Sequence, residues 1–122
     1  MNRKFLNLFK NEKPILAMLH LKGTSDEDIV RRFKEEIAIY AENGVDCIIV
    51  ENYFGNYRHM EMALDYISKL NLVIPYGVVS ESRSMRFELA EKYGASFVQL
   101  DSVVGHVKPR DEATLDAFFD CT

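Results

Sequence analysis

The chain has 122 residues, of which 48% are hydrophobic and 28% charged, and its formal net charge is −4. This composition excludes a disordered chain and predicts a single domain, residues 1–122, while the acidity disfavours nucleic-acid binding, which needs clustered Lys and Arg. Cys47 and Cys121 lack metal-finger spacing, and no segment has the pattern of a membrane span or a secretory leader, so we expect a cytoplasmic protein.

Short apolar runs alternate with amphipathic stretches along the chain. Residues 14–20, PILAMLH, predict a first buried strand, and residues 45–50, VDCIIV, predict a second. A third candidate covers residues 72–79. It contains Pro75, which lacks the N–H that a central strand needs, so pairing is expected to begin at or just beyond it. Residues 96–100, SFVQL, predict a fourth strand.

Helical periodicity fills the intervals between these strands. Before the first helix, either Thr24 with Glu27 or Ser25 with Asp28 forms a capping box, and Gly44 supplies the left-handed stop. The apolar positions recur at three- and four-residue steps, which is typical of a helix face packed on a core. They are Ile29, Phe33, Ile37 and Tyr40 in the first helix, Met60, Ala63, Leu64, Ile67 and Leu70 in the second, and Met85, Leu89, Ala90 and Tyr93 in the third.

The later part of the chain repeats this organisation. Ser82 is a candidate cap for the third helix, Gly94 is its stop, and residues 110–120 predict a fourth helix. Four strands alternating with four helices indicate an α/β protein with a parallel sheet covered by helices. We therefore expect four consecutive βα units of a TIM-type barrel, that is, a half barrel, preceded by a short N-terminal helical segment.

Polar side chains follow the strands. Because the carboxyl ends of parallel strands emerge at one edge, where ligands bind in barrels and open sheets alike, we expect these side chains to share one rim. They are His20 and Lys22 after the first strand, Glu51 and Asn52 at the second, Ser80 and Glu81 at the third, and Asp101, Ser102 and His106 at or after the fourth.

Each of these residues also has an ordinary structural interpretation. Glu51 can cap a helix, His20 can be a hydrogen-bonded rim histidine, and Asp101 with Ser102 can form a strand-to-loop turn. A solvated Lys22 fits as well as a Schiff-base lysine. A metal site would need His20, Glu51 and Asp101 to converge, and we predict neither a metal nor a cofactor.

Two motifs resemble the BtpA/SgcQ family. KPILAMLHL, residues 13–21, is similar to the first strand of that family, and NGVDCIIVENYFGN, residues 43–56, is similar to its second. Residues 74–84 and 93–106 stand where the family has its third and fourth strands. The resemblance implies a TIM barrel related in appearance to phosphosugar isomerases and aldolases. Some members are implicated in photosystem I biogenesis, and others are found in sugar-utilisation operons.

The resemblance also implies a ligand site at the barrel mouth, where His20, Glu51 and Asn52 match motif positions. The chain departs from the family at KGTSDE, which replaces a proline-rich stretch, and at Ser80 and Asp101, which replace asparagines. These departures affect the expected ligand contacts after the first, third and fourth strands.

The function expected from this site is the binding of a small polar ligand such as a sugar phosphate. If the protein is an isomerase, epimerase or aldolase-like lyase, Glu51 or Asp101 is the base, His20 the acid and Asn52 the residue that orients a substrate oxygen. The other expected ligand-binding residues are Lys22, Ser80, Ser102 and His106. The alternative is a non-catalytic assembly or biogenesis factor that acts through protein–protein contacts.

A complete barrel has eight βα units and typically ~250 residues. Four units would leave two strand edges and the interior face of the sheet open. Three alternative arrangements would cover these surfaces: pairing of two copies into a two-fold barrel, a C-terminal half absent from this sequence, or an open sheet packed by the N-terminal segment.

Overall fold

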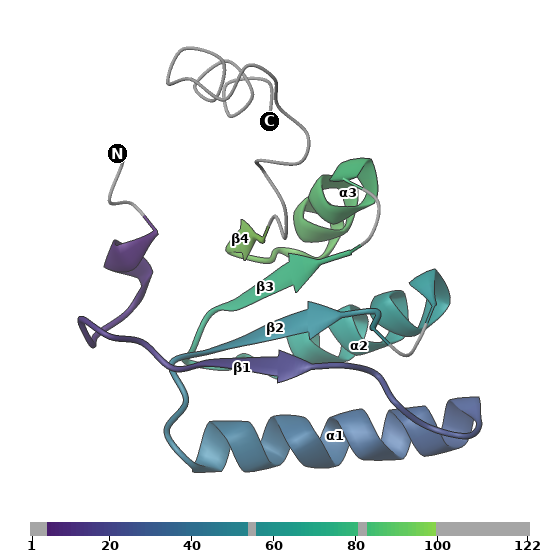
Figure 1. Cartoon of the computed structure of the whole chain (residues 1–122). Helices are drawn as coiled ribbons and strands as arrows, with labels where there is room; N and C mark the ends of the chain where they lie inside the picture. Colours follow the sequence, from purple (N-terminus) through teal and green to yellow (C-terminus); the bar gives the residue numbers. More distant parts are fainter. Residues whose placement is uncertain (1–4, 54–55, 81–82, 100–122) are drawn as a thin grey trace.

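The computed structural model describes residues 5–53, 56–80 and 83–99, and the predicted fourth helix and the Ser82 cap lie outside these ranges. The strands form one parallel sheet in the order β1-β2-β3-β4, each connected to the next by a helix, which confirms the α/β class and the βα repeat (Figure 1). The elements are η1 (Leu6–Leu8), β1 (Leu16–Leu19), α1 (Asp26–Glu42), β2 (Cys47–Glu51), α2 (Tyr57–Lys69), β3 (Tyr76–Val79), α3 (Arg83–Tyr93) and β4 (Phe97–Val98).

The helices cover one face of the sheet with a single hydrophobic core. Alternate strand residues point to this face because successive side chains in a strand point to opposite sides. From the strands the core receives Leu19, Ile48, Val50 and Val78, and from the helices Ile29, Phe33, Ile37, Met60, Ala63, Leu64, Ile67 and Leu89. The predicted apolar faces of the first two helices are thus confirmed, except that Leu70 follows the end of α2 and is exposed.

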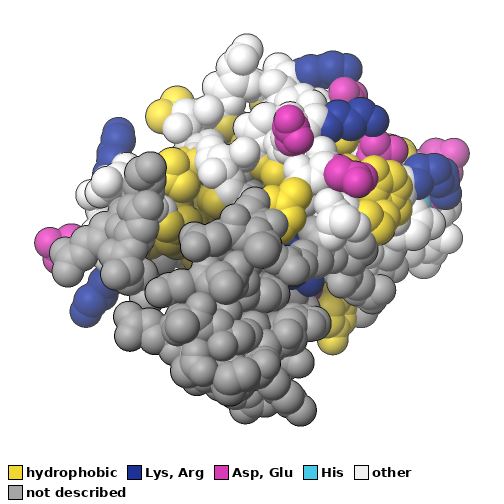
Figure 2. All heavy atoms as spheres, turned by 90° about the horizontal axis from the view of Figure 1, so that it is seen from above, with side chains coloured by type: hydrophobic (Ala, Val, Ile, Leu, Met, Phe, Trp, Pro, Cys, Tyr) yellow, Lys and Arg dark blue, Asp and Glu magenta, His cyan; other side chains and the backbone are white. Residues whose placement is uncertain are grey.

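The opposite face of the sheet has a smaller core. Cys47, Ile49 and Val79 are buried there, with Met18, Phe9 and Phe97 packed against them. Phe5 contributes to an aromatic cluster in which its ring centroid lies 5.1 Å from that of Phe9 and 5.0 Å from that of Phe97. The N-terminal segment therefore covers part of this face. Figure 2, which looks down from above, shows hydrophobic side chains near its centre and charged ones mostly around the periphery.

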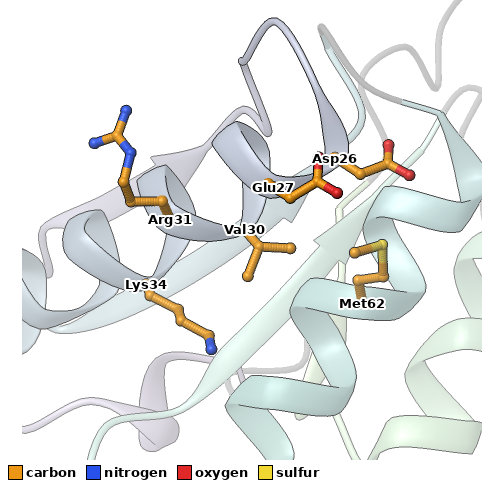
Figure 3. Close-up of a pocket in the computed structure, with 6 residues that line it drawn as sticks. All are labelled: Asp26, Glu27, Val30, Arg31, Lys34 and Met62. Atoms are coloured by element: carbon orange, nitrogen blue, oxygen red, sulfur yellow. The ribbon is translucent and has the colours of Figure 1, made fainter.

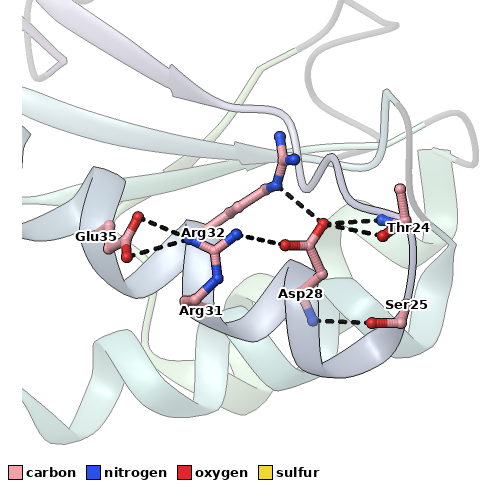
Figure 4. A network of polar contacts seen from close by, with 6 residues as sticks. All are labelled: Thr24, Ser25, Asp28, Arg31, Arg32 and Glu35. Atoms are coloured by element: carbon pink, nitrogen blue, oxygen red, sulfur yellow. Dashed lines mark hydrogen bonds and ion pairs between the residues drawn. The ribbon is translucent and has the colours of Figure 1, made fainter.

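The start of α1 is fixed by the predicted Ser25–Asp28 pair, in a modified form. Ser25 Oγ accepts a hydrogen bond from the Asp28 N–H at 3.1 Å, which is the expected cap. The Asp28 carboxylate, however, accepts from the Thr24 N–H at 3.0 Å, one residue before the cap. The same carboxylate binds Arg31 and Arg32, and Arg31 also binds Glu35 (Figure 4). These contacts tie the first turns of the helix together.

Two glycines and a proline end or limit the helices and strands at the positions predicted from the sequence. Gly44 and Gly94 have φ of 76° and 70°, the left-handed conformation expected after α1 and α3. Pairing of β3 begins at Tyr76, directly after Pro75, as its missing N–H requires. Among the described helices, none is long and apolar enough to cross a membrane.

Candidate functional site

His20 and Glu51 meet at the carboxyl ends of β1 and β2. Leu19 is paired with Val50 in the parallel register, so the residues that follow, His20 and Glu51, stand side by side and face the same way. His20 Nε2 lies 3.2 Å from Glu51 Oε2, and the two side chains are 44% and 25% exposed. The structure thus brings together two of the three predicted catalytic residues. The third, Asp101, lies outside the described residues, as do Ser102 and His106.

Tyr53 adds an aromatic ring to this pair. Its ring centroid lies 5.3 Å from that of His20, with 35° between the ring planes, and the residue is 67% exposed. It follows Asn52, which is half-buried. No pattern in the sequence predicts a role for Tyr53. Its position two residues after the predicted base was the available signal, but only the fold shows that its ring returns to His20.

The backbone next to His20 has an unusual conformation. Leu21 is buried and has φ of 58°, in the left-handed region that costs a non-glycine residue roughly 1–2 kcal/mol. Lys22 follows with an exposed side chain. Strained residues of this kind cluster at functional sites, where the surrounding structure holds them. Here the buried Leu21 side chain anchors the chain between the predicted acid and the predicted ligand-binding lysine.

A second carboxylate, that of Glu36, lies near His20. Burial raises the pKa of Glu36, on α1, and the nearby His20 and Arg32 partly oppose this rise. Glu36 therefore lies close enough to interact with the imidazole. The His20 ring accordingly has Glu51 within hydrogen-bonding distance and Glu36 at longer range.

A buried arginine binds the backbone at the carboxyl end of β3. Arg86, on α3, is 5% exposed, and its guanidinium donates from Nε to the Ser80 carbonyl oxygen and from Nη1 to the Gln99 carbonyl oxygen at 3.1 Å. Buried charges need such acceptors. Ser80 is itself buried, so its hydroxyl is much less accessible than the His20–Glu51 pair. The signal in the sequence was an arginine in helical register with Leu89, Ala90 and Tyr93.

A groove of about 440 Å³ lies between α1 and α2, in the helix layer (Figure 3). Asp26, Glu27, Val30, Arg31, Lys34 and Met62 line it. Three of its four charged residues have protein partners: Asp26 contacts Arg58 and His59, Arg31 contacts Asp28 and Glu35, and Lys34 lies over the Tyr66 ring. A groove of this kind is the solvated surface between two packed helices, and it does not compete with the strand ends as the candidate site.

His59 belongs to a structural contact beside the groove. Its Nδ1 accepts from the Asn56 N–H at 3.1 Å, completing the capping box of α2, and its Nε2 lies 2.9 Å from Asp26 Oδ1. An accepting Nδ1 places the proton on Nε2, which then donates to Asp26. The residue is buried and joins the first turns of α1 and α2. It is therefore a capping histidine.

No cluster of three or more His, Cys, Asp or Glu side chains arranged to hold a metal ion occurs within residues 5–53, 56–80 and 83–99. Comparison of the chain with models of known protein families, with curated proteins and with solved structures yields no match. The BtpA/SgcQ resemblance therefore remains a prediction based on the two strand motifs.

Proposed function

We propose that the protein binds a small polar ligand, such as a sugar phosphate, at the carboxyl ends of its strands and transfers protons with His20 and Glu51. The observation that carries this proposal is the 3.2 Å contact between these side chains, both partly exposed at the edge where ligands of parallel α/β proteins bind. Exposed ion pairs contribute about 0–1 kcal/mol to stability, so stability alone gives little reason for the pair.

The proposed chemistry is a proton shift next to a carbonyl group. The Glu51 carboxylate takes a proton from the carbon beside the carbonyl, while a protonated His20 gives one to the carbonyl oxygen, which forms an enediol. Glu51 then returns the proton to the former carbonyl carbon, while the now neutral His20 takes the proton from the hydroxyl group on the adjacent carbon, which becomes the carbonyl group of the isomer. Asn52 and Lys22, close to the pair in sequence, would bind ligand oxygens. Asp101, Ser102 and His106 stay candidates from the sequence, and this reaction would make the enzyme an isomerase or epimerase, with an aldolase-like lyase as the related alternative.

Fructose monophosphate in D2O tests this proposal. Proton transfer by the enzyme exchanges the hydrogen beside the carbonyl for deuterium, which proton NMR follows without knowledge of the natural substrate. We expect exchange with the wild-type protein and its loss by roughly 100-fold or more in Glu51→Gln, since general acid–base catalysis contributes about that factor. Glu35→Gln, on the exposed side of α1, is the matched control. Exchange at the wild-type rate in Glu51→Gln would overturn the assignment.

We also propose that the chain is a half barrel of the BtpA/SgcQ family. Four parallel strands in sequential order, joined by three described helices, are compatible with half a (β/α) barrel, and the two strand motifs support membership of the BtpA/SgcQ family. We also propose a cytoplasmic location, because Cys47 is a buried free thiol, which fits a reducing compartment.

A second candidate function is that of an assembly factor acting through protein contacts. The observation that favours it is a set of exposed apolar residues at the end of the molecule where the strands begin, opposite the rim. Ile15 is 62% and Val73 92% exposed there, with Leu16 and Leu70 nearby in sequence. Binding of a partner that is weakened in Val73→Asp but unchanged in Glu51→Gln would support this function over catalysis.

Association of two copies is proposed as the way to close the sheet. β1 is an edge strand whose flank carries the exposed Ile15 and Leu16. One part of this edge is already occupied, because the Tyr40 hydroxyl donates to the Met18 carbonyl oxygen at 2.8 Å. Pairing of another strand along β1 must displace Tyr40, so we expect association only at high protein concentration.

A further inference from the structure

Tyr53 stands beside the His20–Glu51 pair with most of its surface exposed. The aromatic ring of Phe33, in the main core, is buried. Tyr53 instead contacts the imidazole on one side, with centroids 5.3 Å apart, and is 67% exposed. It thus presents an apolar ring at the place where the polar groups of the candidate site gather.

The neighbours of Tyr53 define which ligand chemistry fits. A carboxylate at Glu51, an amide at Asn52 and an imidazole at His20 bind hydroxyl groups by hydrogen bonds. An aromatic face attracts C–H groups, because the ring carries negative charge on its face. A ligand that satisfies both surfaces has hydroxyl groups around its edge and a face of C–H bonds. A cyclic sugar has this form, whereas an open-chain polyol has the hydroxyl groups but no rigid face.

A flat heterocycle fits less well. It would use the tyrosine face but would offer no hydroxyl groups to the carboxylate and the imidazole, so these groups would lose water on binding and gain no hydrogen bond from the ligand, which costs affinity. Sites for small ligands usually combine an apolar or aromatic wall with a few placed polar groups. In the candidate site, Tyr53 is the aromatic wall, and His20 and Glu51 are the polar groups.

We propose that Tyr53 is a ligand-contacting residue that selects the cyclic form of a sugar by stacking against its C–H face while His20 and Glu51 bind its hydroxyl groups. This inference rests on the proposed function and deepens it, since it names the ligand as a ring. Tyr53 acts here in recognition of the ring, and the proton-transfer roles stay with the pair, which act after the bound ring opens, because only the open-chain form has the carbonyl group.

The test compares two ligands that differ in the ring. The terminal phosphate monoester of glucose is mainly cyclic in water, and that of sorbitol carries a similar set of hydroxyl groups on an open chain. Each is titrated into isotope-labelled protein, and NMR shifts of His20 and Glu51 report binding. We expect the wild-type protein to bind the glucose ester roughly 2- to 10-fold more tightly, the range for one aromatic contact.

Variants at Tyr53 assign this preference to its ring. Tyr53→Ala is expected to remove the difference between the two esters, and Tyr53→Phe to keep it, because the ring and not the hydroxyl makes the contact. Val73→Ala, which shortens an exposed apolar residue at the other end of the fold, is the matched control and should keep the preference. The chain contains no Trp, so Tyr53→Trp places a single tryptophan at the site, and its emission, excited selectively at the red edge, should respond to the glucose ester.

The outcomes separate this inference from the proposed function. If both esters shift His20 and Glu51 but Tyr53→Ala leaves the preference unchanged, or the wild-type protein has none, the ring-selection inference is overturned and the proposed function stands. If neither ester shifts the pair, both are overturned. Melting temperatures of all variants, measured alongside, verify that the exposed substitutions leave the fold intact.

Discussion

Asp28 shows how one carboxylate can organise the start of a helix. It accepts from the Thr24 N–H and binds Arg31 and Arg32 at 2.6 and 3.0 Å. The Thr24 backbone contact, followed by the Arg31 contact, holds the pKa of Asp28 well below its usual range, and Arg32 adds to this effect. A carboxyl group with a lowered pKa stabilises the folded state above its unfolded pKa, and this contribution is lost as the pH falls through the folded value.

Asp28→Asn therefore changes the pH dependence of stability. We expect the variant to melt at a lower temperature than the wild-type protein at pH 7, and the difference to shrink as the pH is lowered below about 4, where the wild-type carboxylate loses its advantage. Thermal unfolding followed by circular dichroism from pH 7 to pH 2 measures this. Glu27→Gln, the neighbouring exposed residue, is the control. Parallel curves for Asp28→Asn and wild type would contradict the assigned contacts.

Residues of the candidate site differ in how far the sequence could predict them. The meeting of His20 and Glu51 followed from strand ends in parallel register, because the pairing of Leu19 with Val50 sets the next residues side by side. The contact of Tyr53 with His20 depends on how the chain turns after β2, which no local pattern specifies. Arg86 was recognisable as an arginine on an apolar helix face, but its acceptors are backbone carbonyls that only the assembled sheet brings within reach.

At the scale of elements, the described strands and helices follow the sequence closely, although the strands are shorter than the apolar runs that predict them. Pro75 cannot donate to a neighbouring strand, so β3 begins after it. The bond from the Ser96 N–H to the Tyr76 carbonyl oxygen marks where β4 approaches β3. The close approach of β3 to the ring of Phe97 was not predictable. It requires Gly77, because a Cβ atom there would lie 2.3 Å from that ring.

Gly77→Ala tests this close approach. The added methyl group must displace Phe97 or bend β3, and we expect a loss of about 1–3 kcal/mol in the free energy of unfolding, the usual cost of overpacking. Urea unfolding gives this value. In a Phe97→Ala background the same substitution should cost much less, because the ring is gone.

Gly44→Ala is the comparison for Gly77→Ala. It has open space around the added Cβ but a φ of 76°, so its cost comes only from the left-handed backbone, roughly 1–2 kcal/mol. Its cost should therefore not depend on Phe97. An unchanged cost of Gly77→Ala after removal of the Phe97 ring would refute the steric explanation.

At the scale of the whole molecule, the free edge of β1 is partly protected by its own helix. Tyr40, predicted as the last residue of an apolar helix face, is half-buried and uses its hydroxyl to bind the Met18 carbonyl oxygen. Exposed strand edges invite pairing with other chains, and natural proteins cover them in such ways. The alternation of apolar runs predicted the sheet, whereas this edge contact depends on the crossing of α1 over β1.

Tyr40→Phe removes the hydroxyl and leaves the ring in place. We expect the variant to associate at lower protein concentration than the wild-type chain, because the Met18 carbonyl group becomes available to another strand. Light scattering over a range of micromolar concentrations measures this. Identical masses for the two proteins across that range would show that Tyr40 does not control access to the edge.

The burial of Cys47 makes its thiol a reporter of how often the sheet opens. Burial, with a smaller effect of Asp46, raises the pKa of this thiol to about 11, and the thiolate is the form that reacts with alkylating reagents. Alkylation in a Cys121→Ser background must therefore wait until the face of the sheet that carries Cys47 opens to solvent. The labelling rate then measures how often this face opens to solvent. Any ligand or partner that stabilises the closed face would slow the labelling in proportion.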